Sequence, residues 1–522
     1  MVSGQDADLP GHRGLQFEEP LIFAQDSPGS SGVDFPAELA DEERLDAARV
    51  SLGGLLRRAP IGLPGFSEPE AVRHYTRLSQ KNYSIDTGLY PLGSCTMKHN
   101  PRLNEKLARL AGIGDLHPLQ PQVTVQGMLE LYDRLAGWLI ELTGMPAVAM
   151  SPAAGAHGEL CGMMCIRAAI DGQEGETSKR RRVLVPESAH GTNPATANLS
   201  GFTIDTIPAD KTGRVDLAAF TEKLGSGEDV AGLMLTNPNT CGLFETDIIE
   251  IAAALHEKGA YLYCDGANLN AIVGRVRPGD LGIDCMHINL HKTFSTPHGG
   301  GGPGAGPVTL SAALAPYAPV PWVVRGPQGA YELVEDEAAA QDRGMKPFGR
   351  LKGFHGQTGM FVRALAYMMS HGRDGLRQVS GDAVLSANYV LARLKDVMSP
   401  AYPGLCKHEV LFDDRFLIGT GVTTMDFAKA MIDAGFHPMT VYFPLVVHGA
   451  MLVEPTETES KHSLDAFIAV MRDLASRAKA GETELFHHAP TTSPRRRIDE
   501  TGAARHPTLR WKPDRTTGAA AD

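Results

Sequence analysis

Short apolar runs alternate with helix-like stretches between about residues 146 and 310. The apolar runs are Val148–Met150, Arg182–Val185, Gly232–Leu235, Tyr261–Cys264 and His287–Leu290. Between them lie stretches with helical periodicity, such as residues 216–224 and 246–258. Short buried strands separated by helices are typical of a mainly parallel sheet that carries helices on both faces. The pattern therefore predicts an α/β fold for this part of the chain.

The pattern outside this region predicts a division into four parts. Residues 1–65 are rich in Gly and Pro and predict an extended N-terminal arm. Residues 66–345 form the predicted large α/β domain, with a polar, irregular junction over 325–348. Residues 346–487 predict a smaller C-terminal α/β domain, whose last helix we expect to begin at a capping box over 456–459. The Arg- and Pro-rich residues 488–522 predict a basic tail.

Composition narrows the class of protein. At 522 residues the chain is too long for one ordinary domain, and its net charge of -12 argues against a nucleic-acid surface. The N-terminus lacks the basic start and apolar run of a secretory signal, and no run of about 18 apolar residues predicts a membrane span. The seven cysteines are odd in number and scattered, which suits a reduced, cytoplasmic chain.

Lys292 and Asp265 carry the strongest chemical signal. Lys292 follows an apolar run and precedes a glycine-rich loop, a poor place for a solvated charge and a good one for a Schiff base with a carbonyl cofactor. Asp265 ends the preceding apolar run, about one helix and one strand earlier. A carboxylate there can keep a pyridine nitrogen protonated, although a helix N-cap is its common alternative role. The pair supplies the minimum parts of a pyridoxal 5'-phosphate (PLP) site.

Other polar groups follow the predicted strands, at the sheet edge where ligands bind in open parallel sheets. Gly155 and Ala156 open a helix whose free N–H groups favour a phosphate, unless this is a simple turn. His190 is placed either to lie against a cofactor ring or to cap the next helix. Asn239 and Thr240 either form a turn or bond the cofactor's ring oxygen.

The segment around Lys292 contains two further features. Residues 299–302, with Gly304 and Gly306, are not a dinucleotide fingerprint, and we interpret them as a mobile loop over the active site. His287 and His291 are four apart, but on a strand this spacing separates them by about 13 Å. The sequence therefore predicts no metal site.

Taken together, these residues make the chain resemble the subunit 2 family of glycine dehydrogenase (decarboxylating), the P-protein of the glycine cleavage system in its two-subunit form. The resemblance runs from about Pro20 to Trp511 and rests on long, specific stretches. These are residues 90–101, 120–121, 152–159, 189–196, 236–240, 289–294 and 453–459.

The resemblance implies a fold type I (aspartate-aminotransferase-like) PLP enzyme. It implies that Lys292 carries PLP, that Asp265 lies on the ring nitrogen and that His190 stacks on the ring, with His291 among the cofactor's neighbours. It further implies glycine decarboxylation with transfer of the aminomethyl group to the lipoyl arm of the H-protein, and a heterotetramer of two copies each of subunits 1 and 2. Candidate residues for binding glycine are Ser94, Thr96, His99 and His117.

Three rival interpretations stay open at this point. One is another fold type I PLP enzyme, such as an amino-acid decarboxylase or an aldolase, which would need no lipoylated carrier. The second is a non-catalytic scaffold subunit that kept the fold, which would bind no PLP. The third is a metal-dependent hydrolase that uses the histidines, which metal analysis would reveal.

Overall fold

The computed structural model describes residues 18–27, 29–32, 42–57, 62–117, 119–298 and 303–510. The chain divides into two compact units, residues 1–84 with 488–522 and residues 85–487. In the first unit the described helices are α1 (Glu42–Leu52), α2 (Glu68–Gln80) and α16 (Glu500–Arg505). Helix α2 begins at a capping box formed by Ser67 and Glu70. The four-part division proposed above remains a prediction.

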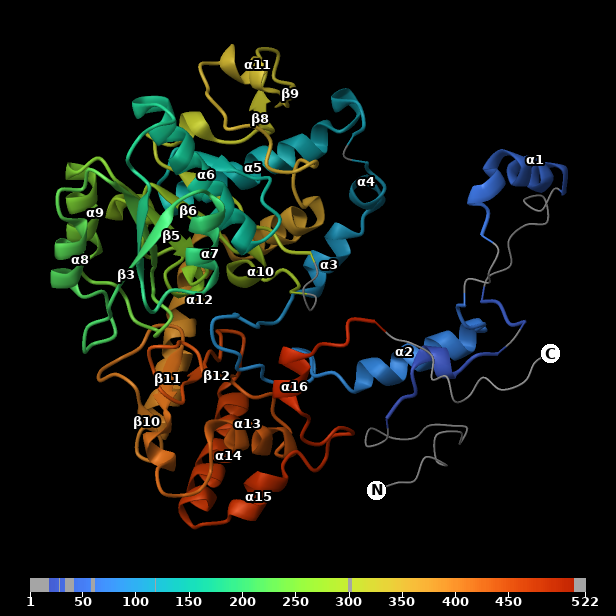
Figure 1. Ribbon diagram of the computed structural model, residues 1–522, viewed down its shortest axis with the longest axis vertical. Helices are drawn as coiled ribbons and strands as arrows, with labels where there is room; N and C mark the ends of the chain where they lie inside the picture. The colour runs from blue at the N-terminus through green and yellow to red at the C-terminus, as the bar shows by residue number, and fades with distance from the viewer. Residues whose placement is uncertain are drawn as a thin grey trace. The chain divides into compact units, whose positions relative to one another are not determined.

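A seven-stranded sheet forms the centre of the second unit (Figure 1). Its order is β1-β7-β6-β5-β4-β2-β3, and every neighbouring pair from β6 to β3 is parallel. β7 runs antiparallel to both β1 and β6. The strands are β1 (Ala147–Ala149), β2 (Arg182–Pro186), β3 (Thr203–Ile207), β4 (Val230–Thr236), β5 (Tyr261–Gly266), β6 (Cys285–Ile288) and β7 (Val308–Leu310).

Helices cover both faces of this sheet, because its strands are apolar on both sides. Leu233 and Leu235 of β4 join one buried cluster, and Met234 between them joins another. The first cluster contains residues of α5 (Gln126–Thr143), α8 (Leu217–Leu224), α9 (Ile248–Glu257) and α12 (Thr358–Leu394). The second contains residues of α6 (Gly155–Glu174) and α7 (Thr192–Leu199). The mainly parallel, two-sided sheet of the predicted fold class is confirmed.

A second, antiparallel sheet follows in the chain, in the order β10-β11-β13-β12. Its strands are β10 (Ser399–Pro400), β11 (Val410–Asp413), β12 (Thr440–Val441) and β13 (Met451–Val453). Helix α12 leads towards it and breaks at Gly372, whose φ of 60° is one that glycine adopts readily. The accompanying helices are α13 (Thr424–Asp433), α14 (Lys461–Lys479) and α15 (Thr483–His488), and α3 (Arg102–Ala108) and α4 (Ala111–Gly114) precede α5.

The structure corrects several local predictions. The last long helix begins at Lys461, with Ser460 as its N-cap, because residues 456–459 belong to a loop in which Thr456 has a φ of 66°. The predicted junction over 325–348 contains a hairpin of β8 (Trp322–Arg325) and β9 (Tyr331–Val334), followed by α11 (Glu337–Gln341). Strands β3 and β7 were not predicted. The predicted loop over 299–302 lies outside the described residues.

The fifth predicted strand also ends earlier than expected. β6 stops at Ile288, and Lys292 lies in the single helical turn α10 (Leu290–Thr293), which starts after Asn289. Among the described residues, none of the helices has the length and apolar character needed to cross a membrane.

Candidate active site

The carboxyl ends of β5 and β6 bring the predicted lysine and aspartate to one edge of the sheet. Asp265 lies near the end of β5, where it is the register partner of His287 on β6. Lys292 follows one helical turn beyond the end of β6. Because β5 and β6 are parallel neighbours, both side chains belong to the same edge. This is the edge at which open α/β sheets bind ligands.

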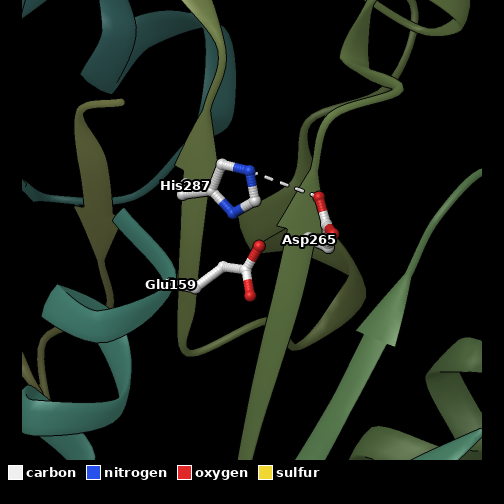
Figure 2. A group of neighbouring side chains, drawn as sticks. All are labelled: Glu159, Asp265 and His287. Carbon is white, nitrogen blue, oxygen red and sulfur yellow. Dashed lines mark ion pairs between the residues drawn. The ribbon is translucent and has the colours of Figure 1, made fainter. Parts of the chain in front are cut away.

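Asp265 is buried and held by several polar partners. Figure 2 shows its ion pair with His287 and the neighbouring Glu159. Asp265 Oδ1 lies 3.3 Å from His287 Nε2 and accepts the N–H of Ala267 at 2.9 Å. Its Oδ2 accepts from Asn193 Nδ2 at 3.2 Å. On the other side of the imidazole, Tyr263 Oη and His287 Nδ1 are 2.5 Å apart. The carboxylate is therefore fixed in place and oriented through His287.

Two buried carboxyls in this cluster have opposite pKa shifts. Burial works against ionised Asp265, but His287, the Ala267 N–H and Lys292 outweigh it, so the pKa of Asp265 lies below its usual value. Burial, and then the negative charge of Asp265, raise the pKa of Glu159 to about 7. Glu159 accepts from Thr192 Oγ1 at 2.7 Å and from Asn193 Nδ2 at 3.1 Å. Near neutral pH, Asp265 is the permanent negative charge of the cluster.

Lys292 is half-buried and acts electrostatically on many groups around it. Its positive charge lowers the pKa of Asp265, where it is a smaller cause than His287. Burial lowers the pKa of His190, and Lys292 lowers it further. At Cys95, burial raises the pKa of the thiol, and Lys292 opposes that rise. The amine thus lies among groups from β5, from the loop after β2 and from the segment around residue 95.

The N-terminus of α6 offers backbone N–H groups that could hold a phosphate. Gly155 starts this helix and the N-cap, Ala154, offers no side-chain hydrogen bond, so the first N–H groups are not capped by a side chain. A Cβ on Gly155 would overlap Asn289 Oδ1. Within the described part of the chain, Asn289 Oδ1 and Ser151 Oγ are buried without a hydrogen-bond partner. Uncapped N–H groups and the unpaired Ser151 hydroxyl can all donate to an anion, whereas Asn289 Oδ1 can only accept.

His190 and His291 lie in different surroundings. His190 is exposed, with Nδ1 at 2.8 Å from Thr192 Oγ1 and its ring edge-on to Phe443. Burial, His298 and Lys292 lower the pKa of His291 to about 3, so His291 is neutral. His291 Nδ1 is buried and has no partner among the described residues. A neutral imidazole with a free nitrogen can bond a cofactor without adding charge.

The side chains of Asn239 and Thr240 form hydrogen bonds with other residues of the chain. Asn239 Nδ2 donates to Gly213 O and to Glu245 Oε1, and Asn239 Oδ1 accepts the N–H groups of Cys241 and Leu243. Thr240 Oγ1 donates to Ser188 O at 2.5 Å. The four bonds of Asn239 use every donor and acceptor site of its side-chain amide. We therefore assign Asn239 to the turn after β4, the alternative role that its sequence left open.

The four candidate substrate residues fall into two groups. The backbone N–H groups of Ser94 and Thr96 donate to Glu409 and Glu454, at 2.8 Å and 3.0 Å. His99 has an exposed side chain. Its backbone carbonyl accepts a hydrogen bond at 2.5 Å from Oγ of Ser295, which lies three residues after Lys292. His117 is exposed in a turn closed by its own Nδ1 and the N–H of Leu119. Hydrogen bonds therefore connect the 94–99 segment to the lysine turn, whereas none of those described ties His117 to it.

Glu159 and His287 are site residues that the sequence reasoning missed. Glu159 is one helical turn after Gly155, which places it on the same side of α6. His287 is the cross-strand partner of Asp265. The ligand atoms of Glu159, Asp265 and His287 lie within 4.8 Å of one another, a spacing that would also admit a metal ion. The ion pair between Asp265 and His287, together with the Asn193 amide that donates to both carboxylates, accounts for the arrangement without one.

Comparisons with known proteins bear on the whole chain. Residues 379–492 match the family model of the glycine dehydrogenase C-terminal domain, and residues 161–301 match that of aminotransferase class V. A probable glycine dehydrogenase (decarboxylating) subunit 2 of Caulobacter vibrioides is 66% identical over 98% of this chain and 96% of its own length. The chain belongs to the glycine dehydrogenase (decarboxylating) subunit 2 family. A relative from Kosmotoga olearia with the same name is 49% identical over 94% of this chain and 99% of its own length.

Solved structures support the fold of this family member. A glycine decarboxylase (P-protein) of the glycine cleavage system, in inhibitor-bound form, superposes with a TM-score of 0.69 at 20% identity, over 85% of this chain and 100% of the other. A sphingosine-1-phosphate lyase of Burkholderia pseudomallei superposes with a TM-score of 0.60 at 15% identity, over 84% and 97%. The predicted family and fold class are confirmed.

Proposed function

We propose that this chain is the PLP-bearing subunit of a two-subunit glycine dehydrogenase, which decarboxylates glycine and passes the aminomethyl group to the lipoyl arm of the H-protein. One observation carries the proposal. A half-buried lysine and a buried, ionised aspartate lie at the ends of adjacent parallel strands, beside the uncapped N-terminus of a 20-residue helix. Family membership supplies the reaction, and the site supplies groups that suit its cofactor.

The residues present fit PLP. Lys292 would attach it, Asp265 would face its ring nitrogen, and the first turn of α6 would hold its phosphate. When bound, PLP withdraws the electron pair left on the α-carbon as carbon dioxide departs. His190 and His291 are the remaining candidates for contacts with the ring and its substituents.

The contribution of Asp265 to this chemistry is electrostatic. The pKa of Asp265 is held below its usual value, so the side chain remains an anion and would keep a proton on the pyridine nitrogen of bound PLP. His287 and Asn193 fix the direction of the carboxylate before substrate arrives. A preorganised charge of this kind costs no reorganisation during the reaction.

The names of the relatives indicate a further subunit. As subunit 2, this chain would work with subunit 1, and we propose a cytoplasmic heterotetramer of two copies of each. Transfer to a lipoyl arm requires that the arm reach the edge of the sheet where Lys292 lies. Ser94, Thr96 and His99 lie beside this edge and remain our candidates for positioning glycine.

The test uses the chain purified with its partner subunit. We expect visible absorbance that borohydride abolishes, and exchange of bicarbonate into glycine that depends on lipoylated H-protein. Lys292→Arg should abolish both, because arginine keeps the charge but cannot form the covalent attachment. Lys223→Arg is the matched control, since Lys223 only pairs with Asp205, at 2.6 Å. Exchange retained in Lys292→Arg would refute the assignment, and absence of bound PLP in the wild type would favour a scaffold subunit.

A further inference from the structure

Two buried glutamates face each other at the end of the smaller sheet. β11 and β13 are antiparallel, with Val410 opposite Val453. Glu409 directly precedes Val410 and Glu454 directly follows Val453, so the same register sets these two residues opposite each other. Both have no exposed surface, and their carboxylate oxygens lie within 4.8 Å of one another and of a nitrogen of His408. Two like charges directly opposite on adjacent strands repel.

No cation balances this pair by direct contact within the described residues. His408 Nε2 comes no closer than 3.9 Å to Glu454 Oε1, and burial lowers the pKa of His408 to about 3, which leaves it neutral. Both ring nitrogens of His408 and Glu409 Oε1 lack a hydrogen-bond partner. Burial raises the pKa of both glutamates, and the positive charge of nearby Lys292 offsets part of that rise.

The glutamates hold the segment that leads to the lysine turn. Ser94 donates its backbone N–H to Glu409, and Thr96 donates both N–H and Oγ1–H to Glu454, at 3.0 Å and 2.5 Å. Ser94 and Thr96 have φ values of 64° and 32°, a backbone region that non-glycine residues rarely adopt. Such a conformation persists only where the surroundings enforce it.

The same segment is bonded to two residues that follow Lys292 in the chain. Lys98 Nζ donates to Thr293 O at 2.8 Å, and Ser295 Oγ donates to His99 O at 2.5 Å. A continuous series of hydrogen bonds therefore runs from the buried glutamates, through residues 94–99, to the turn that carries the reactive amine.

We propose that Glu409 and Glu454 hold one proton between them and act as positioning residues, holding residues 94–99 against the Lys292 turn. Protonation of one carboxyl removes the repulsion between the two and leaves one negative charge towards Lys292. Burial and then Glu454 raise the pKa of Glu409 well above its usual value, and burial raises that of Glu454 to about 7, which agrees with one retained proton near neutral pH. Among the described residues, the other titratable groups near the pair are Cys95, Cys241, Cys406, His408 and Glu457. Glu457 is itself paired with Lys98, at 2.7 Å.

The first experiment measures the proton on the chain alone, without cofactor. Infrared difference spectra near neutral pH are recorded for wild type minus Glu409→Gln, minus Glu454→Gln and minus the double variant. One proton held by the pair predicts one protonated-carboxyl band in all three, with the double variant losing no more than either single one. The proposal would be overturned by two additive bands or by a band that survives in one single variant. A metal ion bound stoichiometrically by the purified chain would overturn it as well.

The second experiment measures positioning at Lys292, and this part rests on the proposed function. In the complex loaded with PLP, the double variant removes a negative charge near the amine. The pH midpoint of the borohydride-sensitive absorbance should then fall by about one unit. Glu245→Gln is the control, because the pKa of Glu245 is likewise raised to about 7 but its partners are Asn239 and Val215. An unmoved midpoint would overturn the positioning role, whereas a wild type without such absorbance would refute the proposed function and leave the infrared result standing.

Discussion

At the residue scale, Asp265 is the group on which the chemistry depends most. Replacing it with Asn keeps the shape and removes the charge. We expect exchange of bicarbonate into glycine to fall roughly 10²–10³-fold, the usual loss when one preorganised electrostatic partner is removed. Steady-state kinetics test this, with thermal unfolding as the control for folding. Activity within a few-fold of wild type would show that Asp265 does not act on the cofactor.

Tyr263 supplies a hydrogen-bond partner to the imidazole that faces Asp265. Tyr263→Phe removes the hydroxyl that lies 2.5 Å from His287 Nδ1 and leaves a buried nitrogen without a partner. The free energy of unfolding should fall by about 1–3 kcal/mol, the cost of an unsatisfied buried polar group. Denaturant titration measures it. A stability equal to that of wild type would mean that water or another side chain replaces the hydroxyl.

The sequence revealed part of this site but not all of it. Lys292, Asp265 and the start of α6 were predictable, because each follows an apolar run that marks the carboxyl end of a strand. Glu159 and His287 were not singled out, because their proximity to Asp265 depends on helix phase and cross-strand register. Asn239 could not be assigned, since only the folded turn shows that its amide has no free bonding group.

At the scale of elements, the junction between α6 and the β6–α10 connection has little free space. A Cβ on Gly155 would overlap Asn289 Oδ1, so Gly155→Ala should displace the first turn of α6 and weaken PLP binding by tenfold or more. Gly137→Ala in α5 is the matched control, because a Cβ there meets nothing within 4 Å and alanine favours a helix. Equilibrium dialysis of PLP measures both. Equal affinities would place the phosphate elsewhere.

The loop before α14 is held by a buried ion pair. Lys98 Nζ lies 2.7 Å from Glu457 Oε1, and Asn270 also donates to Glu457, at 3.1 Å. Lys98→Met should cost about 3–5 kcal/mol of unfolding free energy, because it leaves a buried carboxylate unpaired. The double variant with Glu457→Gln should recover part of that loss. If both variants lose the same amount, the pair contributes through packing and not through charge.

The same contacts explain why the capping-box prediction was wrong. Thr456–Glu459 has a suitable composition for a helix start, but Glu457 is committed to Lys98 and Asn270 across the fold. The helix therefore begins later, at Lys461 behind Ser460. A local sequence pattern contains no information about such long-range partners. β3 was missed for a related reason, because as an edge strand its residues are only partly buried and lack a clear apolar run.

At the scale of the whole molecule, raised carboxyl pKa values predict how stability varies with pH. Burial raises the pKa of Glu245 to about 7 from an ordinary value of 4.5. The folded chain therefore binds this proton more tightly than the unfolded chain does. The stabilisation is complete below about pH 4.5 and is lost as pH rises through about 7.

Glu245→Gln isolates this contribution. As pH rises from 4.5 to 7, the unfolding free energy of wild type should fall relative to that of the variant. At higher pH the difference between the two should stay constant. Denaturant titrations over this range measure the difference. A difference independent of pH would mean that Glu245 has an ordinary pKa in the folded chain.

The most direct test of the whole account is peptide mapping of the complex after reduction with borohydride. Mass spectrometry then identifies the lysine that carries the reduced cofactor. The account predicts a single modified peptide containing Lys292, and none in Lys292→Arg. A cofactor found on another lysine, or on none in the wild-type complex, would contradict it.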